Sequence, residues 1–360
     1  MSEHLLLGVD GGGTKTVAWI ACIDDPGQVL GRGSSGPSNP QVVGAETCLV
    51  RLDEAIDAAF ADAGLNRRSF AAACIGLAGA DREADRKNIE QWTAQCGLAE
   101  RLCVVNDALP VLYAASAAGC GVALISGTGS FAFGCRDPGT FVVTGFSRST
   151  GKSNLGATRP AEAGHYERQG RDDGTTARAG GWGYLFGDEG SAYAIAVDGL
   201  RAAARSADGR GPATCLLDLL LAELGRSRAE DLISAVYDPA TTRTQIAALS
   251  RVVFQARDAG DSVAGEIIHE ATNSLAEMVQ AVVAKLRFST RSFPLALTGG
   301  VVLHHHELQT GLEIELHNRG LRADPVVAVP DPVAGALVIA HQAACLDDAG
   351  VLPQELRVES

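Results

Sequence analysis

Short apolar runs alternate with amphipathic stretches along the first third of the chain. Apolar runs that end in glycines or polar turns predict β-strands, and apolar residues that recur about every 3.6 positions predict helices. The predicted strands are Leu5–Val9, Thr16–Ile23, Gln28–Gly33, Ala72–Leu77 and Leu102–Val105, and the predicted helices are Ala45–Ala63, Arg82–Cys96 and Ala108–Ala118. Three antiparallel strands followed by strand–helix repeats indicate one α/β domain over residues 1–118.

The same pattern begins again after residue 118. The predicted strands are Gly121–Ile125, Phe131–Cys135, Phe141–Thr144, Phe293–Leu297 and Val326–Val329, and the predicted helices are Gly190–Ala204, Ala213–Leu224, Gln245–Asp258, Asp261–Arg287, one after Gly300, and Val333–Leu346. Both halves open with a meander around a glycine turn, which indicates an internally duplicated fold with a second domain over residues 119–360. The last helix starts with small residues at 332–336, so we expect it to return to the first domain.

Residues 147–179 interrupt this order. They are rich in Gly, Ser, Thr and Arg and hold hardly any large apolar side chains, so they cannot bury much surface. We expect a mobile surface insertion. A lid whose arginines reach a bound phosphate is the alternative, and those arginines are Arg148, Arg159, Arg171 and Arg178.

The composition limits the class of partner. Of the 360 residues, 46% are apolar and 20% are charged, and the formal net charge is -13. Such an acidic chain is poorly suited to nucleic acid or an anionic membrane surface as its main partner. No apolar stretch is long enough to predict a membrane span, and we expect no signal peptide. Nine scattered cysteines without a Cys-x-x-Cys pair fit reduced thiols, so we expect a cytoplasmic protein.

Three glycine-rich turns carry the strongest functional signal. Each follows a predicted strand, and they read DGGGTK from Asp10, SGTGS from Ser126 and LTGG from Leu297. Glycine allows a sharp turn and brings backbone N–H groups against a phosphate that a side chain would keep away. The acidic residue in the first turn and the hydroxyls in the first two suggest a nucleotide held between two halves of the chain.

The three turns resemble the phosphate-1, phosphate-2 and adenosine motifs of the sugar kinase/Hsp70/actin superfamily. Within it, the run GGWGYLFGDEGSAY at residues 180–193 resembles the N-acetylglucosamine kinases of the BadF/BadG/BcrA/BcrD group. The resemblance covers nearly the whole chain except residues 147–179. It implies a duplicated actin-like ATPase (ribonuclease H-like) α/β fold with a cleft between two domains. It also implies a kinase that uses ATP and Mg²⁺ on an amino sugar, and the resembled kinases are commonly homodimers.

The resemblance assigns the nucleotide contacts to the three turns, namely to Gly12, Gly13, Thr14, Lys15, Gly127, Thr128, Gly299 and Gly300. Asp10 is expected to hold Mg²⁺ through water, because Mg²⁺ favours a few carboxylates together with phosphate oxygens. Each assignment has a plain structural alternative. Asp10 is also a turn-forming residue, Lys15 is equally well a solvated charge, and the Gly299–Gly300 pair is also typical of a strand-to-helix turn.

Asp107 is the candidate general base. It follows the predicted strand Leu102–Val105 and precedes a helix, a location that opens onto a cleft in α/β folds. In the resembled kinases the aspartate at this position takes the proton of the sugar 6-hydroxyl. A helix N-cap is the alternative role, and the neighbouring Asn106 is equally able to serve as that cap.

The resemblance also suggests residues that bind the sugar. Carboxylate and amide groups clamp neighbouring hydroxyls, and the candidates are Asn39, Asp81, Asn106, Gly181 and Asp188. Asp188 has an alternative role as the N-cap of the helix predicted from Gly190, and Asn39 is also explained by an Asn-Pro turn. Gly181 lies where the family makes room for the N-acetyl group.

Other functions stay open at this point. A glucosamine or muramic acid kinase would carry the same motifs, because glycines and alanines do not encode the acetyl pocket. A regulatory ATPase of the BadF group that couples its nucleotide to a protein partner is the rival from another class. That rival would use cysteines to hold an iron–sulfur cluster between subunits, and no cysteine here has such spacing.

Overall fold

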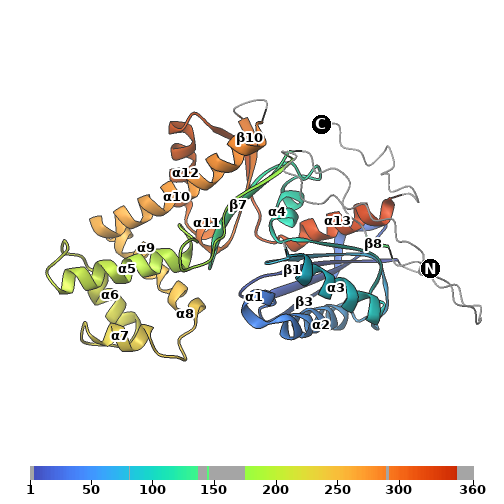
Figure 1. Cartoon of the computed structure of the whole chain (residues 1–360), viewed down its shortest axis with the longest axis horizontal. Helices are drawn as coiled ribbons and strands as arrows, with labels where there is room; N and C mark the ends of the chain where they lie inside the picture. Colours follow the sequence, from blue (N-terminus) through green and yellow to red (C-terminus); the bar gives the residue numbers. More distant parts are fainter. Residues whose placement is uncertain (1–3, 81, 137–143, 146–174, 289–291, 347–360) are drawn as a thin grey trace, which may run out of the picture. The chain divides into compact units, whose positions relative to one another are not determined.

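The computed structural model describes residues 4–80, 82–136, 144–145, 175–288 and 292–346. The chain divides into two compact units (Figure 1). Unit 1 comprises Met1–Cys120, Asp137–Thr175 and Asp331–Ser360, and unit 2 comprises Gly121–Arg136 and Thr176–Pro330. Each unit is built around its own mixed β-sheet.

Unit 1 contains a six-stranded sheet in the order β3-β2-β1-β4-β5-β8. Its strands are β1 (Leu5–Gly11), β2 (Thr16–Cys22), β3 (Asp25–Ser35), β4 (Phe70–Leu77), β5 (Ala99–Asn106) and β8 (Thr144–Gly145). Strands β1, β4 and β5 are parallel, whereas β2, β3 and β8 pair antiparallel to their neighbours. The central strand β1 is buried over most of its length, as its unbroken apolar run predicts.

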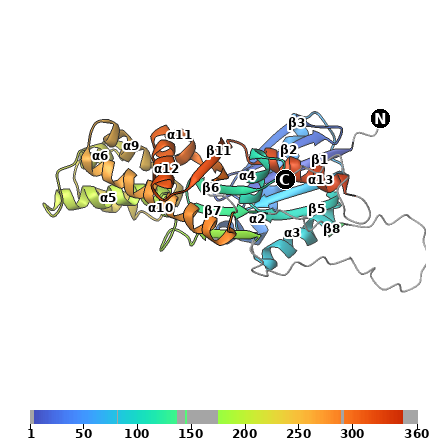
Figure 2. The same cartoon turned by 90° about the horizontal axis from the view of Figure 1, so that it is seen from above.

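Helices cover both faces of this sheet (Figure 2). One face packs against α2 (Ala45–Asp62) and α3 (Glu83–Cys96), with the short α1 (Pro40–Val43) just before α2. The other face packs against α4 (Ala108–Ala115) and the last helix, α13 (Val333–Cys345). The chain therefore returns to unit 1 for its final helix, although residues 176–330 before it belong to unit 2.

Glycines allow α13 to approach its neighbours closely. A Cβ atom on Gly335 would overlap the carbonyl oxygen of Pro110 in α4. A Cβ atom on Gly8 of β1 would lie 2.8 Å from the backbone nitrogen of Leu337. The small residues at the start of α13 are thus explained by backbone-to-backbone packing, which any side chain would prevent.

We expect Gly335→Ala to lower the free energy of unfolding by about 2–3 kcal/mol, because the new methyl group has no space beside Pro110. Gly265→Ala in α10 (Ser262–Leu286) is the matched control, since nothing lies within 4 Å of its Cβ position. That control should stabilise the helix by about 0.5–1 kcal/mol. Urea denaturation measures both, and equal effects at the two glycines would refute the close packing of α13.

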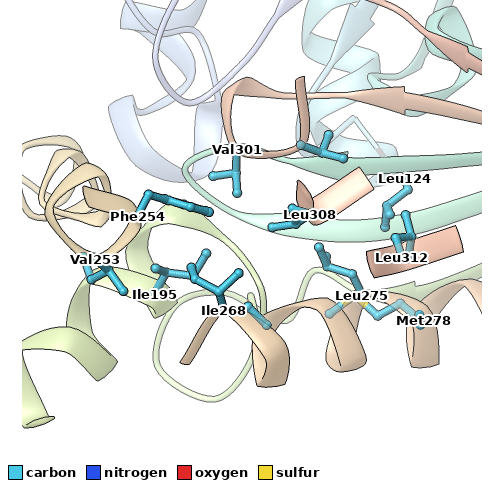
Figure 3. Packing of buried hydrophobic residues seen from close by; sticks show 14 of the residues in the cluster. Leu124, Ile195, Val253, Phe254, Ile268, Leu275, Met278, Val301, Leu308 and Leu312 are labelled. Carbon is cyan, nitrogen blue, oxygen red and sulfur yellow. The ribbon is translucent and has the colours of Figure 1, made fainter. Parts of the chain in front are cut away.

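Unit 2 contains a five-stranded sheet in the order β11-β10-β6-β7-β9. Its strands are β6 (Gly121–Ser126), β7 (Ser130–Cys135), β9 (Thr176–Gly180), β10 (Ser292–Thr298) and β11 (Arg322–Ala328). The remaining helices are α5 (Ala192–Ala207), α6 (Leu216–Glu223), α7 (Asp231–Val236), α8 (Arg243–Ala248), α9 (Ser250–Asp258), α11 (Gly300–His304) and α12 (His306–Asn318). Figure 3 shows how side chains from α5, α9, α10, α11 and α12 meet in one apolar core with Leu124 of β6.

The strand order confirms the duplication. The first five strands of the unit 1 sheet lie side by side in the order β3-β2-β1-β4-β5. If the strands of unit 2 are also counted along the chain, its order β9-β7-β6-β10-β11 is the same: third, second, first, fourth, fifth. In both sheets the first strand lies at the centre, with antiparallel partners on one side and parallel partners on the other. Each unit is therefore one copy of the same α/β module.

Three predictions about unit 2 are wrong. The third strand of its meander is Thr176–Gly180, which pairs with β7, and not Phe141–Thr144; the described end of that segment, Thr144–Gly145, pairs with β5 in unit 1. The predicted insertion therefore ends earlier than residue 179, and residues 147–174 of it lie outside the described residues. The predicted helix Gln245–Asp258 is two helices that meet at Leu249, and α7 was not predicted.

Candidate active site

The parallel strands of unit 1 end side by side at one edge of the sheet. Gly11 of β1 pairs with Leu77 of β4, and Leu77 pairs with Asn106 of β5. The loops after these strands therefore begin next to one another, as they do where α/β sheets bind ligands. This edge gathers the predicted residues Asp10, Gly12, Gly13, Thr14, Lys15, Asn106 and Asp107.

Asp10 sits at this edge on the same face of β1 as Gly8, because side chains alternate along a strand. Burial raises the pKa of Asp10 to about 6, the nearby Lys15 opposes the rise, and the carboxylate of Asp331 adds to it. Asp331 precedes α13, whose first turn packs on Gly8 with the Val333 oxygen 2.9 Å from its Cβ position. A buried carboxylate with a raised pKa, together with a second carboxylate within electrostatic range of it, fits a divalent cation such as Mg²⁺.

The phosphate-1 turn is closed by a hydrogen bond from the Gly12 N–H to the Lys15 oxygen at 3.0 Å. The Gly12 oxygen accepts from the N–H groups of Ser38 at 3.1 Å and Asn39 at 3.2 Å, so the turn is attached to the loop before α1. The Asn39 oxygen accepts from the Gln41 N–H at 2.9 Å and caps α1. The structure therefore shows Asn39 in the turn that begins α1, and its contact with the sugar stays a prediction.

Asn106 caps α4. Its Oδ1 accepts from the N–H groups of Ala108 at 3.2 Å and Leu109 at 3.0 Å. Asp107 occupies the cap position but makes no capping hydrogen bond with its side chain. The helix-capping role considered for Asp107 is therefore carried out by Asn106. The catalytic role of Asp107 and the sugar contact of Asn106 remain predictions.

In unit 2, the SGTGS turn joins β6 to β7 and is bonded to residues 180–190, which we call the signature loop. The Ser126 hydroxyl donates to the Gly190 oxygen at 2.8 Å, and the Ser130 hydroxyl donates to the Glu189 oxygen at 2.6 Å. The Ala192 N–H, just beyond the loop, donates to the oxygen of Gly127 at 2.8 Å. The serines of the phosphate-2 turn therefore fix the signature loop, a role that their sequence alone did not predict.

Asp188 is the most constrained side chain of the signature loop. It is 5% exposed and has φ 61°, a left-handed conformation that is unusual outside glycine and is found at functional sites. Its Oδ1 accepts from the Ser130 N–H at 3.5 Å, and its carboxylate lies 3.0 Å from the Cβ position of Gly129. A buried carboxylate thus faces the phosphate-2 turn.

Burial raises the pKa of Asp188, whereas the Ser130 N–H and the positive charges of Arg243 and Arg178 lower it. The helix-cap alternative for Asp188 is wrong. The cap of α5 is Ser191, whose hydroxyl oxygen accepts from the Ala194 N–H at 3.2 Å. The Asp188 side chain is consequently directed at the turn and not at the helix.

The turn after β10 lies against the phosphate-2 turn. Gly299 has φ 101°, and a Cβ atom there would overlap the Ser126 oxygen. The Cβ position of Gly127 lies 3.7 Å from the Gly299 Cα and 3.8 Å from the Gly300 nitrogen. Only glycines allow the two turns to come so close. The alternative of a plain strand-to-helix turn therefore does not fully explain the Gly299–Gly300 pair.

The structure thus gathers the predicted residues into one group in each unit. The group in unit 2 comprises Gly127, Thr128, Gly181, Asp188, Gly299 and Gly300. Asp81 lies outside the described residues. Among the residues that the structure describes, no three His, Cys, Asp or Glu side chains form a metal cluster.

Three residues near these groups, Asp331, Phe131 and Arg243, had no site role predicted from the sequence, and a fourth, Arg178, was predicted only as an arginine of the insertion. The charge of Asp331 lies close enough to raise the pKa of Asp10, and its local sequence signal is an aspartate before Pro332, the N-cap residue of α13. Phe131, Arg178 and Arg243 surround the signature loop. Arg178 was assigned to the mobile insertion, and nothing local to Arg243 indicates that α8 would reach the loop.

A family model matches residues 7–155 and 169–340. The chain belongs to the BadF/BadG/BcrA/BcrD ATPase family. Among the residues of this chain that the structure describes, no helix is both long and apolar enough to cross a bilayer. All nine cysteines are described and carry free thiols.

Near-full-length relatives of this family member are sugar kinases. The N-acetyl-D-glucosamine kinase of Dictyostelium discoideum is 31% identical over 350 residues, covering 94% of this chain and 98% of the relative. The N-acetylmuramic acid/N-acetylglucosamine kinase of Clostridium acetobutylicum is 32% identical over 336 residues, covering 93% and 98%. A Chromobacterium violaceum structure, provisionally named an N-acetylglucosamine kinase, superimposes with a TM-score of 0.66 at 24% identity, covering 94% of this chain and 100% of that one. The predicted actin-like α/β fold is confirmed.

Proposed function

We propose that this protein is an ATP-dependent kinase that transfers the γ-phosphoryl group of ATP to the 6-hydroxyl of N-acetylglucosamine. The proposal is carried by the hydrogen bonds that tie the phosphate-2 turn to the signature loop of this kinase family. One rigid substructure of unit 2 thereby presents both a phosphate-binding turn and a buried carboxylate. The near-full-length similarity to two N-acetylglucosamine kinases supports the same activity.

In the proposed reaction, the Asp107 carboxylate accepts the proton of the sugar 6-hydroxyl. The 6-oxygen forms a bond to the γ-phosphorus, the bond from that phosphorus to the bridging oxygen breaks, and ADP leaves with the electron pair. Position at the end of β5 supports Asp107 as the base, since Asn106 satisfies the start of α4. Asp188 and Asn39 are proposed to bind sugar hydroxyls.

Backbone N–H groups of the glycine turns are proposed to neutralise the phosphates, with Lys15 adding a positive charge. Asp10, with Asp331 beside it, would hold Mg²⁺, which compensates the charge that develops on the transferred phosphoryl group. The residues fit the ion because burial leaves the Asp10 carboxylate with a raised pKa and a second carboxylate nearby. The free thiols of all nine cysteines agree with a reducing cytoplasm as the proposed compartment.

The activity test is ADP release from Mg²⁺-ATP with N-acetylglucosamine, glucosamine, N-acetylmuramic acid, glucose or no sugar. We expect N-acetylglucosamine to stimulate ADP release on the order of 100-fold over the sugar-free rate, because an acceptor hydroxyl must replace water at the γ-phosphorus. Glucose, which lacks the acetamido group, serves as the control. Hydrolysis that is indifferent to every sugar would contradict the kinase and favour a partner-coupled ATPase.

A further inference from the structure

Two serines stand at the two ends of the phosphate-2 turn. Ser126 is the last residue of β6 and Ser130 is the first residue of β7, and the two are directly opposite each other in the pairing of these strands. Residues opposite each other in antiparallel strands have their side chains on the same face of the sheet. Both serines are buried, with 0% and 1% of their surface exposed. The turn that the sequence assigns to phosphate thus places two hydroxyls side by side in the interior of unit 2.

Both hydroxyls donate to the signature loop. The acceptor of Ser126 is the Gly190 oxygen at 2.8 Å, and the acceptor of Ser130 is the Glu189 oxygen at 2.6 Å. A serine hydroxyl has a single hydrogen to donate, and the phosphate oxygens of ATP need a donor. Because these hydrogens are already used inside unit 2, nucleotide binding does not explain why the turn begins and ends with serine.

The two acceptors belong to a tight turn that begins at Asp188. The Ser191 N–H donates to the Asp188 oxygen at 3.1 Å, and Gly190, the third residue of this turn, has φ 75°. A positive φ at the third position is typical of a type II turn, which favours glycine there. The serines of the phosphate-2 turn therefore hold the second and third carbonyl groups of the turn whose first residue is Asp188.

Helix α10 packs directly against the same turn. A Cβ atom on Gly190 would lie 2.6 Å from Cγ of Leu275 and 2.8 Å from the Ala271 oxygen. Gly190 is thus held by close packing on α10 and by the hydrogen bond from Ser126. Without that hydroxyl the Gly190 oxygen loses this hydrogen bond, and a buried carbonyl that lacks a partner costs free energy. The turn would recover part of this cost by shifting, and a shift would move the Asp188 carboxylate.

Resting on the proposed function, in which Asp188 binds a sugar hydroxyl, we propose that Ser126 is a positioning residue for the sugar. Its hydroxyl fixes the turn that orients the Asp188 carboxylate, and Ser130 supports the same turn. A serine of the phosphate-2 motif thereby controls the use of the sugar, and the nucleotide is left to the backbone N–H groups of the motif.

The experiment measures kcat/KM for N-acetylglucosamine at saturating Mg²⁺-ATP, and the Kd for Mg²⁺-ADP by calorimetric titration. Ser126→Ala should lower kcat/KM for the sugar about 5- to 50-fold, the range for a buried polar group that loses its partner, and should change the Kd for Mg²⁺-ADP less than about twofold. Thr93→Val is the matched control in α3. It removes a hydroxyl of a residue that is 1% exposed and that donates to the Glu90 oxygen at 2.8 Å, and it should change neither quantity.

A double-mutant cycle tests whether Ser126 acts through Asp188. Asp188→Asn alone should lower kcat/KM for the sugar. In that background Ser126→Ala should cost at least about threefold less than in the wild-type protein, because the charged group that the serine positions is already gone. Losses that simply multiply in the double variant would contradict the proposal, since Ser126 would then act by a route that does not include Asp188.

The outcomes separate this inference from the kinase function itself. If Ser126→Ala weakens Mg²⁺-ADP binding as much as it lowers kcat/KM for the sugar, or changes neither, the inference is overturned and the proposed function stands. If Ser126→Ala does not fold, as judged by circular dichroism, Ser126→Cys decides with the same two measurements, because it replaces the hydroxyl by a weaker donor and should give a smaller loss on the sugar alone. A wild-type enzyme that is inactive on every sugar would overturn both proposals.

Discussion

Asp107→Asn is expected to lower kcat by about 100-fold or more while changing the Kd for N-acetylglucosamine by less than about threefold. The amide has the size of the carboxylate and can still hydrogen-bond the 6-hydroxyl, but it cannot take up the proton. The start of α4 should be unaffected, because Asn106 provides the capping hydrogen bonds. ADP release under saturating Mg²⁺-ATP gives kcat, and calorimetric titration with the sugar gives Kd.

A matched control for this variant is Asp218→Asn, an exposed aspartate in the first turn of α6. It removes the same charge from the protein and should leave kcat unchanged. If Asp107→Asn keeps wild-type turnover, Asp107 is not the base. If it loses sugar binding and turnover in the same proportion, Asp107 serves to bind the substrate.

Asp10→Asn is expected to abolish most turnover and, in the absence of ligands, to stabilise the protein at neutral pH. Burial raises the pKa of Asp10 to about 6, above its ordinary value of 3.8, so the folded protein holds this proton more tightly than the unfolded chain. Above pH 6 the carboxylate is ionised in both states, and the burial of its charge costs free energy. A shift of about two pKa units corresponds to roughly 3 kcal/mol at most, and we expect 1–3 kcal/mol at about pH 7.5.

The direction of the pH dependence follows from the same shift. Below about pH 4, Asp10 is protonated and its burial does not lower the free energy of unfolding. As the pH rises from 4 through 6 the buried carboxylate ionises and destabilises the folded protein, so the higher free energy of unfolding of Asp10→Asn should appear over that interval. Urea denaturation of both proteins at about pH 4 and 7.5, without nucleotide or Mg²⁺, measures it. Asp331→Asn should stabilise in the same direction by a smaller amount, because its charge adds to the rise.

Binding of Mn²⁺ with ADP, followed by electron paramagnetic resonance, gives a readout that does not depend on turnover. Asp10→Asn should weaken it about tenfold or more if Asp10 holds the metal through water. An Asp10→Asn protein that is destabilised at both pH values would show that the carboxylate forms favourable interactions in the ligand-free protein. That result would contradict the proposal that Asp10 is a buried carboxylate whose charge is compensated only when a cation binds.

The local pattern of the sequence was sufficient for the elements with strong signals. The apolar run at Leu5–Val9 and the long periodic segment of α10 are where they were predicted, because burial of a whole strand or of one helical face leaves a regular pattern. The predictions failed where that pattern is weak. Strand β9 contains Thr, Ala, Arg and Gly, so only its pairing with β7 makes it a strand.

By itself, the sequence determined the duplicated α/β fold and the three glycine turns, because backbone freedom and periodic burial are local properties; Asp107 as the general base stays a prediction. Only the tertiary structure decided which neighbours each side chain meets. It gave the cap of α4 to Asn106, attached the signature loop to the phosphate-2 serines, and put Asp331 beside Asp10. Asp10 and Asp331 lie at opposite ends of the chain, and their proximity depends on the packing of α13 against β1; the small residues at 332–336 indicated a return to unit 1, but not which strand α13 would meet.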